Sequence, residues 1–140
     1  MTTGSWEHFP HDADVGVRGL GATPAEAFAQ AAIAMTAVIT DPDCVKPTEA
    51  VEISCHAPDL EILLVDWLNA LVLEMTTRKL LFARFDVALD NSSLKAMAYG
   101  EPIDVLRHQP ATEVKGATFT ELSVTQSLDG RWIAQCILDV

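Results

Sequence analysis

Two long segments of the chain carry apolar residues at the spacing of an α-helix. The first begins at Thr23-Pro24-Ala25-Glu26, a motif that combines a capping box with a proline in the first helical turn. A helix is predicted from this motif to about Val38. Pro42 prevents its continuation because proline has no backbone N–H to donate. The predicted buried stripe consists of Phe28, Ala31, Ala32, Met35 and Val38.

The second helical segment is predicted to begin after Asp59, a favourable capping residue, and to continue to around Thr77. Apolar side chains cover most of its circumference, which is typical of a helix that is buried on more than one side. The segment is therefore expected to form the centre of the core. Its apolar residues are Leu60, Ile62, Leu63, Leu64, Val65, Trp67, Leu68, Leu71, Val72, Leu73 and Met75.

Several shorter segments alternate apolar and polar residues, as half-buried strands do. Two pairs of them flank the turn sequences Asn91-Ser92-Ser93 and Ser127-Leu128-Asp129-Gly130, so each pair is predicted to form a hairpin. This pattern favours an α+β class: a single domain over residues 1–140, with a largely antiparallel sheet and two main helices packed on one face. It does not set the strand order. Strands are predicted at residues 15–20, 51–55, 81–89, 94–100, 118–126 and 131–138.

Composition narrows the classes of function. The 140 residues are 49% hydrophobic and carry a net charge of −11, so the chain should fold but should repel nucleic acid phosphates. Such a surface suits cations and basic partner proteins. Three cysteines without metal-site spacing indicate free thiols in a reducing cytoplasm. The apolar run at residues 60–75 is too short to span a membrane, and no secretory signal is visible.

The segment from His11 to Asp14 is the first candidate for chemistry. Its two carboxylates, Asp12 and Asp14, follow two histidines and precede a predicted strand. Such a turn can present oxygen atoms to a cation. Aspartate is also common in turns for structural reasons, so on spacing alone a plain turn with exposed histidines is the favoured explanation.

The second candidate is the end of the chain, Asp139 and Val140. A docked last strand would hold the Asp139 side chain beside the Val140 α-carboxylate, and two adjacent anions need a compensating cation or donor. A frayed, solvated terminus is the alternative. The docked form is supported by apolar alternation that continues to the end of the strand, at Trp132, Ala134, Cys136 and Leu138.

The third candidate is the polar loop of residues 100–116, which places Arg107, His108 and Lys115 in an otherwise acidic chain. It is read either as an anion contact or, more simply, as a connecting loop. No phosphate-binding loop and no nucleophile elbow occur. An enzyme would have to use His11 or His108 as a general base beside a carboxylate, a combination too common to support that reading.

Six ordered sequence blocks resemble the archease family over nearly the whole chain. They are His11 to Gly16, Thr23 to Phe28, Asp59 to Asn69, Gly100-Glu101 with Asp104 to His108, Glu113 to Lys115, and the terminal Asp139-Val140. The resemblance implies a small cytoplasmic protein that activates the GTP-dependent tRNA-splicing RNA ligase. It would promote ligase guanylylation and multiple turnover, without being an enzyme itself, and would meet RNA only through the ligase.

The resemblance also implies a divalent metal site, with calcium as the expected ion. The matching residues are Asp14, Asp139 and the Val140 carboxylate, which are hard oxygen donors suited to calcium. His11, Asp12, His108 and Lys115 are expected to support that site or to contact the partner. Two departures from the family pattern are visible: Asp12 stands where threonine is usual, and Thr118-Phe119-Thr120 stands where Thr-Tyr-His is common.

Two other hypotheses stay open beside the ligase activator. One is a general chaperone-like, metal-binding protein without a dedicated ligase partner. The other is a stand-alone hydrolase that uses His11 or His108 with Asp14. A protein that acts by contact with the ligase is distinguished from both by its effect on ligation rates.

Overall fold

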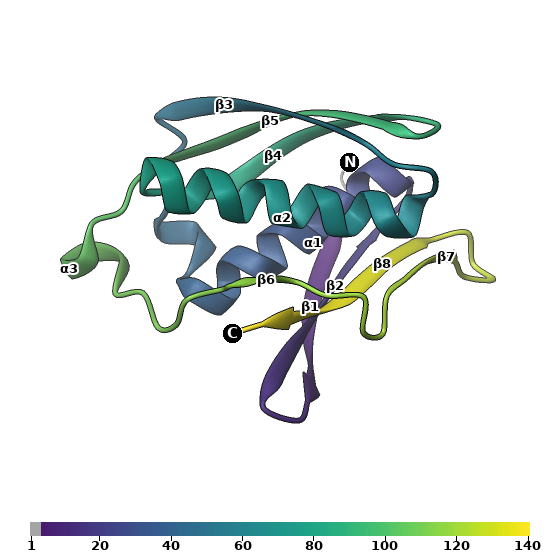
Figure 1. Cartoon of the computed structure of the whole chain (residues 1–140), viewed down its shortest axis with the longest axis horizontal. Helices are drawn as coiled ribbons and strands as arrows, with labels where there is room; N and C mark the ends of the chain where they lie inside the picture. The colour runs from purple at the N-terminus through teal and green to yellow at the C-terminus, as the bar shows by residue number, and fades with distance from the viewer. Residues whose placement is uncertain (1–3) are drawn as a thin grey trace.

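The computed structural model describes residues 4–140, in which helices and antiparallel strands alternate (Figure 1). The helices are α1 (Pro24–Ile39), α2 (Leu60–Arg78) and the short α3 (Val105–His108), with a 3₁₀ turn, η1, at Pro42–Cys44. The strands are β1 (Ser5–His11), β2 (Asp14–Gly21), β3 (Glu49–His56), β4 (Leu80–Asp90), β5 (Ser93–Pro102), β6 (Gly116–Ala117), β7 (Ser123–Gln126) and β8 (Trp132–Asp139).

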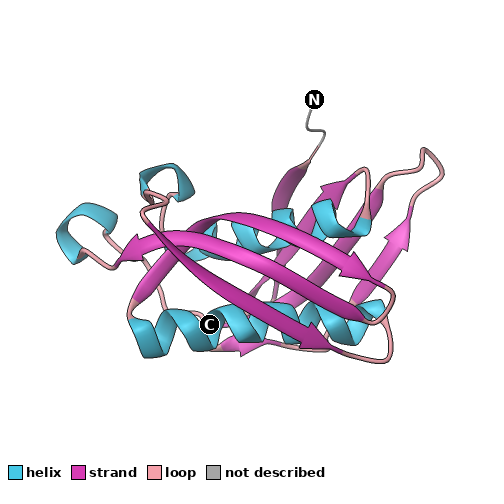
Figure 2. Ribbon diagram, turned by 90° about the horizontal axis from the view of Figure 1, so that it is seen from above, coloured by secondary structure: helices cyan, strands magenta, loops and turns pink. Residues whose placement is uncertain are grey.

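The strands form two antiparallel sheets. One sheet has the order β1-β2-β8-β6, with β7 also paired to β8, and the other has the order β3-β5-β4. The long helices α1 and α2 lie between the sheets, and each contacts both of them (Figures 1 and 2). The expected α+β class is confirmed, but the strands divide over two sheets where one was expected. The helices explain this difference, because apolar residues around most of α2 need cover on two sides.

The boundaries of both long helices follow the capping signals in the sequence. Thr23 accepts a hydrogen bond from the Glu26 backbone N–H at 3.1 Å, and Asp59 accepts one from the Ile62 N–H at 2.8 Å. Helix α2 ends at Lys79, which has a left-handed conformation with φ of 55°. None of the helices within residues 4–140 is long and apolar enough to cross a membrane.

Small residues let α1 lie directly against β2. Ala27 and Ala31 are fully buried, and a Cβ atom added to Gly19 of β2 would stand 2.1 Å from the Ala27 carbonyl oxygen. No larger residue fits at position 19 unless the helix moves away. This close contact fixes the sheet that carries the N-terminal and C-terminal strands.

Two strand predictions need correction. No strand was predicted before residue 15, but the segment that ends at His11 forms β1, and only Asp12 and Ala13 connect it to β2. Its alternation is weak because β1 is an exposed edge strand, where Pro10 is tolerated. The strand expected from Thr118 begins only at Ser123, since the backbone turns at Glu121, where φ is 55°.

Trp67 of α2 joins both helices and a sheet. Its indole N–H donates to the Phe28 carbonyl of α1 at 3.0 Å, and its ring meets the Phe85 ring of β4 edge-on at 5.8 Å. The side chain is fully buried. It therefore supplies packing and a hydrogen bond at the centre of the core.

Replacing Trp67 with phenylalanine should remove this hydrogen bond and leave part of the ring volume empty. We expect Trp67→Phe to lower the free energy of unfolding by about 2–3 kcal/mol in urea denaturation. The matched control is Trp132→Phe, because Trp132 is only half-buried and its indole makes no hydrogen bond within residues 4–140. Equal losses in the two variants would contradict the central role of Trp67.

Candidate functional site

The pairing of β2 with β8 brings the beginning and the end of the chain together. Val15 pairs with Leu138, and Val17 pairs with Cys136. Asp14 and Asp139 are the next residues along these two neighbouring strands. The two carboxylate clusters expected from the sequence are therefore adjacent in the fold.

The side chains of Asp14 and Asp139 point away from the helices. Val17, Cys136 and Leu138 are fully buried against the core, and Val140 also packs on it. Because side chains alternate along a strand, Asp139 projects to the opposite face, and its neighbour Asp14 projects with it. Within residues 4–140, neither carboxylate makes an ion pair or side-chain hydrogen bond, so no cation of this chain compensates them.

His11 extends this row of polar side chains on β1. The strand register places His11 opposite Asp14, and cross-strand pairs of an antiparallel sheet project to the same face. The Nδ1 atom of His11 is buried and has no hydrogen-bond partner in the described part of the chain. Its nearest carboxylate oxygen, in Asp12, lies 4.0 Å away, and the Asp12 side chain is exposed.

The chain alone supplies an incomplete set of metal ligands. Across residues 4–140, no group of three or more His, Cys, Asp and Glu side chains is arranged to hold a metal ion. Asp14, Asp139 and the Val140 carboxylate offer two side chains and one main-chain group. Unpaired hard oxygens beside an orphaned imidazole nitrogen still suit a divalent cation, provided that water or a partner fills the remaining positions.

The backbone of Lys115 lies beside this carboxylate cluster. Its backbone N–H donates to the Asp139 carbonyl at 2.8 Å, and the next residue, Gly116, pairs with Asp139 in the sheet. The side chain is exposed. Lys115 therefore belongs to the surface around the chain terminus.

Arg107 and His108 are held by a buried acid, Glu101. Arg107 Nη2 donates to Glu101 Oε1 at 2.6 Å, and His108 Nε2 lies 3.0 Å from Glu101 Oε2. The Asp104 N–H donates to His108 Nδ1 at 2.9 Å, so the ring proton sits on Nε2 and points at Glu101. The backbone N–H of Lys46 adds a further hydrogen bond to Glu101 Oε2, at 2.7 Å.

This network gives part of the 100–116 loop a structural role. Hydrogen bonds from Arg107 and Lys46 lower the pKa of Glu101 to about 2, so the carboxylate stays ionised. His108 is 3% exposed, which leaves its ring no surface for a partner. His108 is enclosed in this network, while the Arg107 side chain joins it and remains 38% exposed. Sequence reasoning assigned Glu101 no role, although an acid followed closely by Arg and His was a signal for such a network.

Glu101 should stabilise the fold at neutral pH and lose this effect in acid. Its pKa in the folded protein, about 2, lies below the ordinary 4.5, so the stabilisation is complete above about pH 4.5 and disappears as pH falls toward 2. We expect Glu101→Gln to be less stable than wild type at pH 7, with a gap that narrows below pH 4.5. Urea denaturation between pH 7 and pH 3 measures it.

The control for this prediction is Glu74→Gln, which removes an exposed pair with Arg78 on α2. Surface pairs of this kind contribute little, so the control should match wild type across the pH range. A constant gap between Glu101→Gln and wild type down to pH 3 would contradict the buried ion pair.

Comparison with known proteins identifies the family of this chain. Residues 6–140 match the model of the archease protein family (MTH1598/TM1083). The archeases of Pyrococcus abyssi and Thermococcus gammatolerans are 38% and 37% identical over 139 residues, covering 96% of this chain and 98% of each relative.

Two solved structures share the fold. The solution structure of protein 1598 of Methanobacterium thermoautotrophicum aligns with a TM-score of 0.85 at 34% identity, over 97% of this chain and 99% of that one. An archease and possible chaperone of Thermotoga maritima aligns with a TM-score of 0.62 over 96% of each chain, and its 18% identity supports the fold alone. Sequence, family model and fold agree, and the chain belongs to the archease family.

Proposed function

We propose that this chain is an accessory protein that activates the GTP-dependent tRNA-splicing RNA ligase in the cytoplasm. It promotes guanylylation of the ligase and repeated turnover, and the ligase itself performs the chemistry on RNA. One observation supports this most: uncompensated carboxylates from both ends of the chain meet at one surface, with too few ligands to enclose a metal. Such a site suits an ion whose remaining ligands come from a second protein.

The residues that would hold the ion are Asp14, Asp139 and the Val140 carboxylate, and calcium is the ion that the family resemblance implies. Calcium accepts six to eight oxygen ligands, so three carboxylates leave positions for water or for groups of the partner. When bound, the ion supplies positive charge at an otherwise acidic surface. His11 and the exposed Asp12 would support the site from the β1–β2 turn.

The charge of the chain favours a protein partner over RNA. A net charge of −11 opposes direct contact with phosphates, so RNA meets this protein through the ligase. The exposed Lys115, next to the chain terminus, is placed to contact the ligase at the same surface. The buried His108 acts within the fold and contributes by holding the 100–110 segment.

The proposal predicts that this protein raises the rate of multiple-turnover RNA ligation by its cognate ligase with GTP. Asp14→Asn and Asp139→Asn should each reduce that activation at least tenfold, because each removes one charged ligand of the ion. The readout is joined RNA per ligase over several turnovers, beside single-turnover guanylylation of the ligase.

The matched control is Asp90→Asn, which removes an exposed carboxylate from β4 in the other sheet. It should activate as wild type does. No activation by the wild-type chain would overturn the proposed function. Full activation by both site variants would show that the carboxylate cluster plays no part in it. Suppressed aggregation of an unrelated protein, without any effect on the ligase, would instead support the general chaperone-like alternative.

Calcium binding should also stabilise the isolated chain. At a calcium concentration one hundred times Kd, mass action adds about 2.7 kcal/mol, which raises the melting temperature by several degrees. We expect Asp14→Asn and Asp139→Asn to lose this shift and Asp90→Asn to keep it, as measured by differential scanning calorimetry. An equal shift in all four proteins would place the ion elsewhere.

A further inference from the structure

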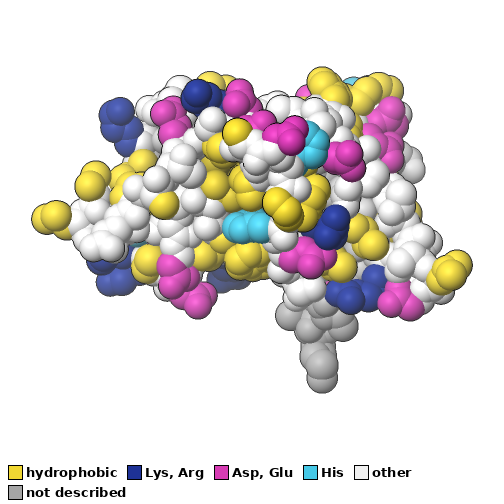
Figure 3. Space-filling view, turned by 90° about the horizontal axis from the view of Figure 1, so that it is seen from below, with side chains coloured by type: hydrophobic (Ala, Val, Ile, Leu, Met, Phe, Trp, Pro, Cys, Tyr) yellow, Lys and Arg dark blue, Asp and Glu magenta, His cyan; other side chains and the backbone are white. Residues whose placement is uncertain are grey.

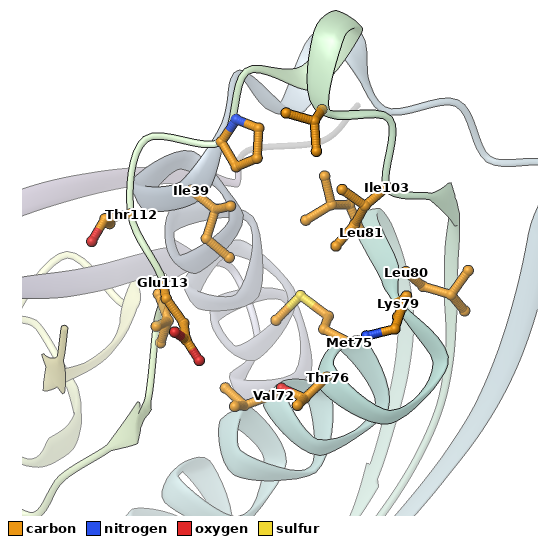
Figure 4. Close-up of a pocket in the computed structure, with 13 residues that line it drawn as sticks. Ile39, Val72, Met75, Thr76, Lys79, Leu80, Leu81, Ile103, Thr112 and Glu113 are labelled. Carbon is orange, nitrogen blue, oxygen red and sulfur yellow. The ribbon is translucent and has the colours of Figure 1, made fainter.

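A hydrophobic cleft opens where α1 and α2 end. It has a volume of about 460 Å³ and lies between the C-terminal part of α2, the end of α1 and the 103–114 segment (Figure 4). Ile39, Met75 and Leu81 contribute apolar surface to it. A cleft of this size with mostly apolar walls is typical of a binding site.

Exposed apolar side chains lie on α3, the short helix beside the cleft. Val105 and Leu106 of α3 are 66% and 89% exposed, and Val105 also lines the cleft. Figure 3 shows hydrophobic side chains protruding at the α3 end of the molecule, on the left, as well as at the opposite end. Val105 thus extends the apolar wall of the cleft, and the next residue, Leu106, is an exposed aliphatic side chain close to it.

The fold holds this hydrophobic surface firmly in place. Arg107, the residue after Leu106, donates to the Cys44 carbonyl at 2.8 Å and to the buried Glu101 carboxylate. His108 closes the short helix through Glu101 and through the Thr40 hydroxyl, which donates to its carbonyl at 2.6 Å. Leu106 is therefore presented to solvent on an anchored support, and partner binding would require little ordering of this segment.

The charges at the cleft indicate the chemistry of its occupant. Lys79 and Glu113 line the cleft from opposite sides, at the end of α2 and on the 103–114 segment (Figure 4). Within residues 4–140 neither forms an ion pair. An apolar segment flanked by an acid to meet Lys79 and a base to meet Glu113 complements both.

One short segment of the chain connects the cleft to the strand that carries Asp139. Glu113 and Val114 line the cleft, and the next residue, Lys115, donates its backbone N–H to the Asp139 carbonyl. The main chain at Asp139 therefore lies one residue away from the cleft-lining Val114, so a large partner at the chain terminus is near the cleft. This continuity favours one partner for both features.

We infer that this cleft, with Val105 in its wall and Leu106 next along α3, receives an apolar segment of the same RNA ligase that approaches the carboxylate cluster. The segment carries aliphatic or aromatic side chains between an acidic and a basic residue. This inference rests on the proposed function and adds a second contact with the ligase. The cleft supplies binding affinity, and the carboxylates act at the ligase's reaction site.

The test measures binding of the purified cognate ligase to full-length variants by biolayer interferometry, together with ligation. Leu106→Ser should weaken binding at least tenfold, and Lys79→Glu should weaken it severalfold by reversing one charge of the cleft. The matched control is Leu128→Ser, because Leu128 is fully exposed on the β7–β8 turn. It should bind within twofold of wild type. Both leucines are solvent-exposed, so circular dichroism melts should be unchanged.

Each contrary outcome has a distinct meaning. If wild type activates and the Asp14→Asn variant does not, while Leu106→Ser and Lys79→Glu bind like wild type, the cleft inference fails and the proposed function stands. If wild type neither binds nor activates the ligase, both fail. A wild-type dimer in analytical ultracentrifugation that Leu106→Ser converts to monomers would identify a second copy as the occupant and overturn the inference.

Discussion

The antiparallel pairing of β2 with β8 is the contact on which the candidate site depends. It joins residues near the start of the chain to the last residues, through the register that sets Val15 opposite Leu138. Burial fixes this register, because a slip by one residue would turn Val17 and Cys136 outward and the aspartates inward. The packing of α1 on Gly19 holds the sheet from behind. The position of Asp14 beside Asp139 is thus a consequence of core packing.

Three features surround this pairing: the carboxylate cluster, the Glu101 network and the apolar cleft. The carboxylate cluster carries charge that no ion pair within residues 4–140 compensates. The Glu101 network, in contrast, is fully satisfied and keeps α3 in a single position. Between them the 112–115 segment lines an apolar cleft and meets the chain terminus. A partner that closes over this region would meet apolar contacts as well as the carboxylates, which is consistent with the proposed accessory role.

The sequence was informative where local chemistry controls structure. Thr23 and Asp59 mark the starts of the long helices because their side chains cap them, and the turn before Gly130 marks a hairpin. It was less informative where a distant contact decides. The strand β1 is exposed and contains Pro10, so its pairing with β2 leaves little trace in its own alternation. The division into two sheets depends on which strands cover the helices. The sequence pattern of one segment does not show this.

The candidate site was likewise only partly predictable from the sequence. The apolar alternation of β8 correctly indicated a docked terminus, and the register then brought Asp139 beside Asp14. The role of Glu101 depends on a backbone N–H at Lys46 and a ring at His108, which come together only in the fold. That these carboxylates hold an ion stays a prediction.

Anomalous diffraction from crystals of the chain bound to its cognate ligase, grown with calcium, tests the central claim most directly. A calcium peak within coordination distance of Asp14, Asp139 and the Val140 carboxylate, with remaining ligands from water or the ligase, is the result that this account predicts. A complex at saturating calcium with no ion at these carboxylates, or with this surface turned away from the ligase, would contradict it.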